Sequence, residues 1–388
     1  RPGRRRGRPM KYVTEFRDGA LAAGLAGAIA REVEPGRDYA FMEFCGGHTH
    51  AISRYGVADL LPANVRLIHG PGCPVCVLPV GRVDMALRLA LARPEVILCT
   101  YADCLRVPAS DGLSLLKAKA RGADVRMVYS AADALALARR APAREVVFFA
   151  IGFETTTPPT ALVIRQAAAE NLRNFSVICN HVLTPPAIDA LLSAPAAPDA
   201  PRPRLDGILG PAHVSVIIGS APYAFAASRH RTPVVITGFE PLDVMQAVRM
   251  LVRQVNEGRA EVENEYTRAV TPAGNRKAQA LMDAVLEVRE TFAWRGLGEL
   301  PASALRIRPA FAAWDAEAKF GLEDRPVPDH KSCECAAILC GAKGPTDCKL
   351  FGTVCTPETP MGACMVSSEG ACAAHYNYGR FRDHASAA

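Results

Sequence analysis

Residues 146–157 read VVFFAIGFETTT, an unbroken apolar run followed by Gly-Phe-Glu and three threonines. A run of β-branched and aromatic residues without polar alternation is typical of a strand that is covered on both faces in a parallel sheet. Residues 234–241 read VVITGFEP, and Gly-Phe-Glu again follows a predicted strand. We interpret this repeat as a sign of two similar α/β units.

Six more apolar runs predict strands, at residues 39–44, 65–69, 96–100, 125–129, 177–180 and 207–210. Helical patterns lie between most of the strands, at residues 83–92, 114–121, 132–139 and 242–255. Alternating strands and helices predict an α/β fold with parallel sheets, and 388 residues suit two or three domains. We expect two Rossmann-like α/β domains, at residues 10–130 and 131–260. A mostly helical or irregular C-terminal domain should follow at 261–388, beginning with charged helices at 261–270 and 277–291.

The net charge of +6 comes almost entirely from five arginines in residues 1–9, which we interpret as a disordered basic tail. The tetrapeptide Arg6-Gly7-Arg8-Pro9 resembles the core of an AT-hook, which inserts arginine into the minor groove of DNA. However, the rest of the chain is close to neutral and offers no phosphate-binding surface. DNA is therefore not an expected partner.

No apolar run reaches the roughly 18 residues that a membrane-spanning helix needs, and no secretory cleavage site follows an apolar core. We expect a cytoplasmic protein with no membrane partner. The chain has thirteen cysteines, and seven of them lie in its final 56 residues. In a reducing compartment, so many thiols predict metal or redox chemistry rather than a disulfide framework.

Residues 44–50 read FCGGHTH and follow a predicted strand. Glycines let the chain turn sharply at the C-terminal end of a strand, where open α/β sheets place their sites. Cys45, His48 and His50 offer one thiolate and two imidazoles, which suit a transition metal. We interpret this motif as a functional site rather than as packing.

Residues 70–76 read GPGCPVC, a Cys-x-x-Cys motif between a predicted strand and a helix. The dipole of a helix lowers the pKa of a cysteine at its N-terminus, which favours thiolate chemistry and reversible disulfide formation. Cys73 and Cys76 are therefore candidates for a redox-active or metal-binding pair. The alternative is half of a structural zinc site, which would need further ligands.

Two more segments follow predicted strands and should lie at the same end of the sheets, namely GFETTT at 152–157 and PAHVS at 211–215. Glu154 could act as an acid, a base or a ligand, and His213 is a further candidate. The threonines could instead cap the next helix. Cys99, Cys104 and Cys179 lie in or beside apolar strands, and we expect them to be buried and inert.

The end of the chain holds the remaining cysteines, Cys333, Cys335, Cys340, Cys348, Cys355, Cys364 and Cys372. An iron–sulfur cluster takes four cysteine ligands, whereas zinc sites usually show paired, closely spaced cysteine knuckles. This segment has no Cys-x-x-Cys and only one Cys-x-Cys. Its spacing therefore favours an iron–sulfur cluster over zinc.

Together these segments resemble the HypD family of hydrogenase maturation proteins, from Met10 to about Tyr378. The matching motifs are CGGHTH (45–50), GPGCPVC (70–76), GFETT (152–156), NHV (180–182), HVS (213–215), GFEPLD (238–243) and GACMVSSEGAC (362–372). The resemblance implies that the protein builds the Fe(CN)2CO unit of [NiFe]-hydrogenases with the chaperone HypC and the cyanide-transferring protein HypE. It also implies a scaffold with redox activity rather than a classical enzyme.

Carried over by motif, the resemblance implies that Cys45 holds iron(II) carrying CO and cyanide, jointly with the N-terminal cysteine of a HypC-like chaperone. Cys73 and Cys76 would form the redox-active pair, with Glu154 and His48 as further catalytic residues. The tail would bind one [4Fe–4S] cluster, as in ferredoxin–thioredoxin reductase, through Cys333, Cys348, Cys355 and Cys372. Cys335 and Cys364 are rival ligands, and Cys340 is an extra cysteine. A free-standing iron–sulfur disulfide reductase with its own small substrate is the alternative function.

Overall fold

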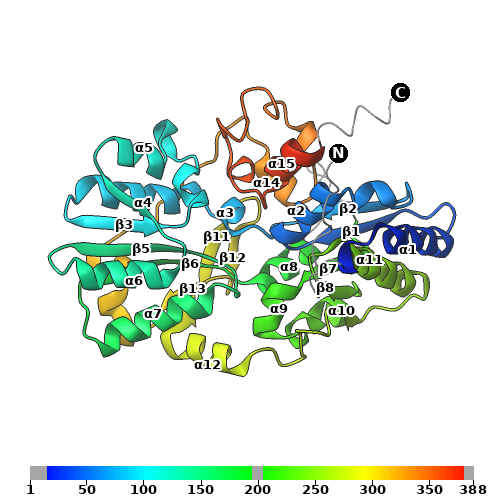
Figure 1. The fold of residues 1–388 in the computed structure, drawn as a ribbon, viewed down its shortest axis with the longest axis horizontal. Helices are drawn as coiled ribbons and strands as arrows, with labels where there is room; N and C mark the ends of the chain where they lie inside the picture. The colour runs from blue at the N-terminus through cyan, green and yellow to red at the C-terminus, as the bar shows by residue number, and fades with distance from the viewer. Residues whose placement is uncertain (1–14, 195–203, 380–388) are drawn as a thin grey trace, which may run out of the picture.

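The computed structural model describes residues 15–194 and 204–379, and it contains two parallel β-sheets with helices packed on them (Figure 1). The predicted α/β class with parallel sheets is therefore confirmed. The basic tail predicted at residues 1–9 lies outside the described residues.

The first sheet has five parallel strands in the order β2-β1-β7-β8-β9. These strands are β1 (Tyr39–Glu43), β2 (Val65–His69), β7 (Gly207–Pro211), β8 (Val234–Thr237) and β9 (Val262–Asn264). Helices α1 (Gly19–Glu32) and α11 (Pro241–Asn256) pack against each other over one face. Phe41 of β1 and Leu251 of α11 are fully buried in the core that results.

The second sheet has four parallel strands in the order β4-β3-β5-β6. These strands are β3 (Val96–Thr100), β4 (Asp124–Met127), β5 (Glu145–Gly152) and β6 (Phe175–His181). One face packs on α6 (Ala131–Arg140) and α7 (Thr157–Ala169), and the other on α4 (Val80–Ala92) and α5 (Leu115–Ala120). Because both faces are covered, β5 is buried at every position after its first residue.

The chain after β9 first forms one helix and two small antiparallel sheets. Helix α12 (Arg276–Val285) packs on α7, and β10 (Leu286–Val288) pairs antiparallel with β13 (Leu305–Ile307), as β11 (Thr291–Trp294) does with β12 (Gly298–Pro301). The other helices are α2 (Gly46–Tyr55), α3 (Pro74–Val77), α8 (Thr184–Ser193), α9 (Ala212–Ile218), α10 (Ala224–His230), α13 (Ala316–Phe320), α14 (Cys335–Leu339) and α15 (Ala371–Ala374). Short turns of 3-10 or π-helix lie at η1 (Glu15–Arg17), η2 (Ala58–Leu60), η3 (Asp103–Arg106), η4 (Ser110–Gly112), η5 (Ala221–Tyr223), η6 (Pro309–Trp314), η7 (Pro345–Asp347), η8 (Ala363–Met365) and η9 (His375–Gly379).

The eight predicted strands and four of the predicted helices are present, with ends that differ by at most three residues from the prediction. The helix predicted at 261–270 is wrong, because this segment forms β9 and a turn. Its backbone bonds the free edge of β8, where Glu265 N–H donates to Ile236 O at 2.9 Å. The helix predicted at 277–291 ends early, at Val285, because the next residues pair with β13 instead.

The strand pairing also divides the chain differently from the predicted domains. Each sheet takes strands from both sides of residue 130, where the sequence analysis placed a boundary. The chain starts in the first sheet, builds the second, and returns to the first at β7. Local patterns locate strands but do not reveal which distant strands pair.

The cysteine-rich segment packs against the helices that follow β1 and β2. In Figure 1 its helices α14 and α15 lie above α2 and α3, between the two sheets. Helix α15 packs on α2, while η8 and α14 both contact α3. This return of the chain brings the cysteines of residues 333–372 to the two cysteine motifs near the N-terminus.

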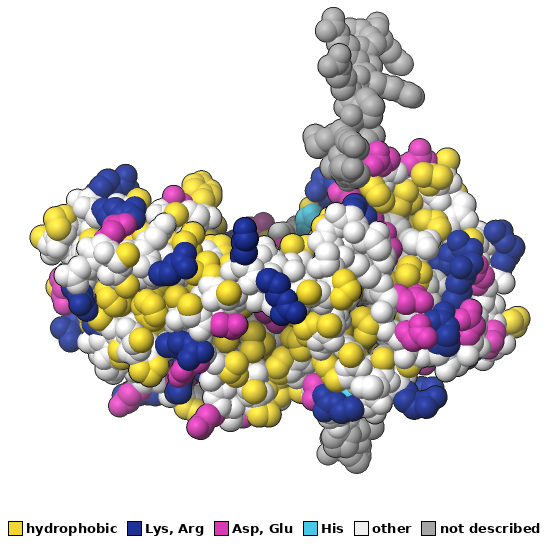
Figure 2. Space-filling model, turned by 90° about the horizontal axis from the view of Figure 1, so that it is seen from below, with side chains coloured by type: hydrophobic (Ala, Val, Ile, Leu, Met, Phe, Trp, Pro, Cys, Tyr) yellow, Lys and Arg dark blue, Asp and Glu magenta, His cyan; other side chains and the backbone are white. Residues whose placement is uncertain are grey.

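Figure 2 shows one face of the molecule, on which acidic and basic side chains are interspersed. This face offers no concentrated basic surface of the kind that binds nucleic acid. In residues 15–194 and 204–379, no helix is both long enough and apolar enough to cross a bilayer.

Candidate functional site

Cys45 lies directly after β1 and caps the N-terminus of α2. Its sulfur accepts a hydrogen bond from Gly47 N–H at 3.3 Å, and its side chain is buried. The two glycines that follow are required by close approach, since a Cβ on Gly46 would collide with Glu369 and one on Gly47 with the Phe239 ring. The sequence motif therefore packs the start of α2 tightly against two distant segments.

The environment of Cys45 opposes its ionisation. Burial raises the pKa of the thiol well above its ordinary value of 9.0, and the carboxylates of Glu369 and Glu43 raise it further. Glu43 is itself fully buried, and it accepts bonds from Cys45 N–H at 3.0 Å, from the Thr49 hydroxyl and from His69 Nδ1. Cys45 thus stays a neutral thiol unless a cation supplies compensating charge.

The three candidate histidines have different surroundings. His213, at the start of α9, is the histidine next to the thiol, with Nδ1 3.5 Å from Cys45 Sγ. His48 instead turns away and donates from Nε2 to Thr237 O and Gly238 O, at 3.2 and 3.0 Å. His50 Nδ1 lies 3.3 Å from Ser368 O. Burial lowers the pKa of both His48 and His213 to about 4, so both rings are neutral at pH 7.

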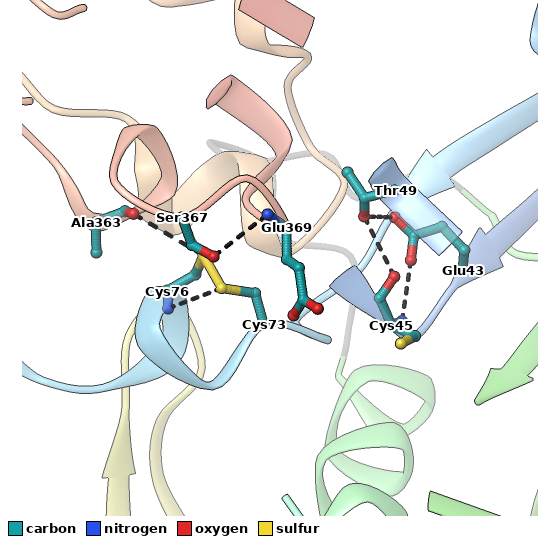
Figure 3. The surroundings of a disulfide bond; sticks show 8 residues. All are labelled: Glu43, Cys45, Thr49, Cys73, Cys76, Ala363, Ser367 and Glu369. Carbon is teal, nitrogen blue, oxygen red and sulfur yellow. Dashed lines mark hydrogen bonds between the residues drawn. A yellow bond between two sulfur atoms is a disulfide. The ribbon is translucent and has the colours of Figure 1, made fainter. Parts of the chain in front are cut away.

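Cys73 and Cys76 form a disulfide at the start of α3, with their Cα atoms 5.2 Å apart. Gly72 holds this turn against the first motif, because its carbonyl accepts Gly46 N–H at 3.1 Å and a Cβ there would strike the backbone of Cys45. On the other side, Cys76 Sγ lies 4.0 Å from Ala363 O. Figure 3 shows the disulfide between Cys45 and the loop of Ala363, with Glu369 pointing into the space beside it.

A small cavity beyond the disulfide is lined by sulfur. Five cysteines contribute to it, together with the apolar side chains of Ile338, Leu350, Phe351 and Met365; the cysteines are Cys333, Cys335, Cys348, Cys355 and Cys372. Cys364 is buried beside them, and thiol hydrogen bonds from Cys333, Cys364 and Cys372 lower the pKa of Cys335 well below its ordinary value. All four ligands expected from the family resemblance, and both rivals, therefore gather at one place.

The donor set suits a soft metal centre. Within the described part of the chain, no three His, Cys, Asp or Glu side chains are placed to hold a single metal ion. Several cysteines gathered around one cavity are instead the donor set of an iron–sulfur cluster, which takes four cysteine ligands. Cys340 donates its thiol to Gly296 O at 3.0 Å and does not line the cavity.

The family model HypD, described as "Hydrogenase formation hypA family", matches residues 20–379. The chain belongs to the HypD family. It is 67% identical over 374 residues to the hydrogenase maturation factor HypD of Cupriavidus necator, which covers 96% of this chain and 98% of that protein. It is 67% identical over 376 residues to the hydrogenase expression/formation protein HupD of Azotobacter chroococcum, covering 97% and 99%. With the HypD of Escherichia coli the identity is 49% over 342 residues, covering 88% and 90%.

This membership gives the protein a role in hydrogenase maturation, a pathway that involves partner proteins. Three of the motifs that suggested the HypD resemblance lie close together in the structure. CGGHTH, GPGCPVC and GACMVSSEGAC all lie around the disulfide. The HypD-family chain thus builds its site from the ends of β1 and β2 and from the last fifty residues that the structure describes.

Glu154 follows the end of β5, and its carboxylate is bound to the start of α8. Its carboxylate accepts bonds from the N–H and the hydroxyl of Thr184, both at 2.8 Å, and so caps α8. Burial raises its pKa to about 7. The threonines after it do not cap α7 through their side chains, because the hydroxyls of Thr156 and Thr157 donate back to Phe153 O.

Two residues of the site were not singled out from the sequence. Glu43 has a visible signal, since a carboxylate inside an apolar strand must find buried partners. Glu369 lies within a matched motif but carries no signal of its own, because its contact with Gly46 depends on the fold. Cys99, Cys104 and Cys179 are buried, as predicted, and burial raises their pKa values to about 12, 12 and 11.

Proposed function

We propose that this HypD-family protein is a scaffold and electron relay for assembly of the Fe(CN)2CO group of [NiFe]-hydrogenases. It acts in the cytoplasm with a HypC-like chaperone and a HypE-like cyanide-transferring protein. One observation supports this function most strongly. The Cys73–Cys76 disulfide lies between the buried thiol of Cys45 and the cysteine-lined cavity, in contact with both segments.

In this proposal the substrate iron(II), carrying CO and cyanide, binds to Cys45 and to the N-terminal cysteine of the chaperone. The raised pKa of Cys45 supports such a role, because a bound cation offsets both burial and the two carboxylates. His213 can then hydrogen-bond the sulfur from 3.5 Å and keep it oriented. His48 stabilises the start of α2 through its hydrogen bonds to the end of β8.

Cys333, Cys348, Cys355 and Cys372 would hold a [4Fe–4S] cluster in the cavity, where all four thiols are present. When bound, such a cluster supplies single electrons. Two of these electrons, taken up with two protons, convert the Cys73–Cys76 disulfide into two thiols. Those thiols can return two electrons to a partner-borne thiocyanate, whose S–C bond breaks to give a thiol and hydrogen cyanide as the S–S bond forms again.

The first prediction tests the scaffold role through Cys45. The protein is co-purified without oxygen with a HypC-like chaperone, and infrared spectra of the complex are recorded. The wild-type complex should show CO and cyanide stretching bands, which Cys45→Ala should lose while it keeps the iron of the cavity. Cys348→Ser should lose the cavity iron instead.

Cys99→Ala is the matched control, because Cys99 is a buried cysteine of β3 with no place in the site. It should retain the bands and the iron. A Cys45→Ala complex with intact bands would refute the assignment of this ligand. A wild-type protein that binds no chaperone yet reduces small disulfides would support the free-standing reductase instead.

A further inference from the structure

Arg295 lies in the turn between β11 and β12. This turn packs between α3, which begins at the disulfide, and α14, the first helix of the cysteine-rich segment. Its backbone N–H donates to Val77 O of α3 at 2.8 Å. The next residue, Gly296, accepts the Cys340 thiol at 3.0 Å and has a φ of 83°, and a Cβ there would collide with Ala336 O of α14. The position of Arg295 is therefore fixed from both sides.

The guanidinium of Arg295 is a buried cation, with 3% of its side chain exposed. Its nearest anion is Asp329, with Oδ1 3.1 Å from Nε, but the N–H bond does not point along this contact. Among the described residues neither Nε nor Nη2 has a hydrogen-bond acceptor. Arginine cannot lose its proton in a protein, and burying a cation with unmet donors is costly.

The turn that carries Arg295 packs on the helix that begins at Cys335, one of the cysteines that line the small cavity. Arg295 and Cys333 also line a second, open cavity of about 550 Å³. Arg295, with its unmet donors, therefore shares a cavity wall with Cys333, whose sulfur would be anionic as an iron ligand.

We propose that Arg295 is a positioning residue that sets the reduction potential of the iron–sulfur centre, an inference that rests on the [4Fe–4S] cluster of the proposed function. A thiolate-bound cluster is an anion, and one-electron reduction makes it more negative by one charge. A fixed cation beside it therefore favours the reduced form and raises the potential, as do hydrogen bonds to its sulfurs. Asp329 acts with the opposite sign, because its negative charge lies in the same place.

The test uses the full-length protein, purified and reconstituted without oxygen. The midpoint potential is measured by titration with dithionite, which donates the electrons, while electron paramagnetic resonance and the visible absorbance follow the reduction. Arg295→Gln should shift the potential to more negative values, and Asp329→Asn should shift it to more positive ones. Arg295→Lys keeps the charge but loses the planar fork, so its potential should lie between those of the wild type and Arg295→Gln.

Arg308→Gln is the control for net charge. Arg308 donates to Asp283 O at 2.7 Å, and its side chain is 43% exposed, so this variant should keep the wild-type potential. If Arg295→Gln fails to hold iron, the positive shift of Asp329→Asn decides the matter. A wild-type protein without a cluster would refute the proposed function itself. Equal potentials in loaded wild type, Arg295→Gln and Asp329→Asn would refute the inference alone.

Discussion

Burial raises the pKa of both Cys45 and Glu154, yet the two residues have different surroundings. Cys45 has a neutral histidine and two carboxylates near its sulfur, and burial and the carboxylates oppose a thiolate more strongly than the N–H groups of Gly47 and His48 favour one. Glu154 has both oxygens engaged by Thr184. At the scale of single residues, Glu154 therefore holds a helix, whereas Cys45 keeps a thiol that is free for the iron-binding role proposed above.

The pKa of Glu154 makes a prediction about stability. Its folded value of about 7 lies above the ordinary 4.5, so the protonated carboxyl is favoured in the folded state. The stability linked to this group is fully present below pH 4.5 and is lost as the pH rises through 7. The loss amounts to about 3 kcal/mol, because each pKa unit corresponds to about 1.4 kcal/mol.

Glu154→Gln is the matched variant, because the amide oxygen can still accept from Thr184 and the group no longer titrates. Urea unfolding of both proteins between pH 4.5 and 8 isolates the contribution. The unfolding free energy of the wild type, taken relative to that of Glu154→Gln, should fall as the pH rises. A constant difference between the two proteins would show that folding does not raise the pKa of Glu154.

At the scale of secondary-structure elements, the site depends on how closely the turn before α3 approaches the start of α2. Gly72 controls this approach, since a Cβ there would collide with the backbone nitrogen of Cys45. Gly72→Ala must push the two turns apart, and such overpacking costs about 1–3 kcal/mol. We expect Gly72→Ala to abolish hydrogenase maturation while the protein still folds, as checked by urea unfolding and by hydrogenase activity in a complemented strain.

Gly24→Ala is the control for a glycine-to-alanine change. Gly24 lies exposed within α1 and has no atom within 4 Å of the added methyl group. Because alanine favours the helix, this variant should gain up to about 1 kcal/mol of stability and retain maturation. Full maturation by Gly72→Ala would mean that the contact between the two turns is not needed.

The elements themselves were predictable because a buried parallel strand leaves a local mark. The runs at 65–69, 96–100 and 234–237 match their strands residue for residue. In contrast, β9 has only three residues and reads as part of a charged helix, and it is a strand because β8 presents a free edge to it. The order β2-β1-β7-β8-β9 depends on contacts between residues far apart in sequence, which no local pattern contains.

The same distinction applies to the site. Cys45, Cys73 and Cys76 stand in short motifs with glycine and proline, so the sequence marks them. The contact of Glu369 with Gly46 joins segments over three hundred residues apart in sequence. The packing of the Arg295 turn between α3 and α14 likewise requires the cysteine-rich segment to fold back onto α3. His213 rather than His48 lies beside Cys45, because the turn of α2 carries His48 away toward β8.

At the scale of the whole molecule, Arg82 joins the second sheet to the segment that leads into the cysteine-rich tail. Its side chain is fully buried in α4 and bonds Asn180 Oδ1 at 2.7 Å and Cys179 O at 3.2 Å, both at the end of β6. The same guanidinium bonds both oxygens of Glu317 in α13, at 2.6 and 3.1 Å. These bonds fix α13, from which the chain continues into the cysteine-rich segment and on to the site.

Arg82→Met tests this anchor. The change leaves Glu317 with Arg289 as its remaining partner, at 2.7 Å. It also leaves Asn180 Oδ1 without its bond from Arg82, and Cys179 O keeps only the longer bond from Arg289, at 3.4 Å. Loss of one member of a buried pair costs about 3–5 kcal/mol, so urea unfolding should show a decrease of this size. Because the tail loses its starting point, limited proteolysis should also cut the segment after residue 321 faster than in the wild type.

Arg139→Met is the matched control, because Arg139 forms an equally well-aligned pair with Glu170 on the surface, where each side chain is 43% exposed. Water and salt replace most of what such an exposed pair contributes, so this variant should unfold close to the wild type. The alternative for Arg82 is that methionine packs among α4, β6 and α13 as well as the ion pair did, since apolar replacements of buried pairs sometimes stabilise proteins. In that case Arg82→Met would be as stable as Arg139→Met and the tail equally resistant to protease, and the anchor would have to be assigned to packing rather than to charge.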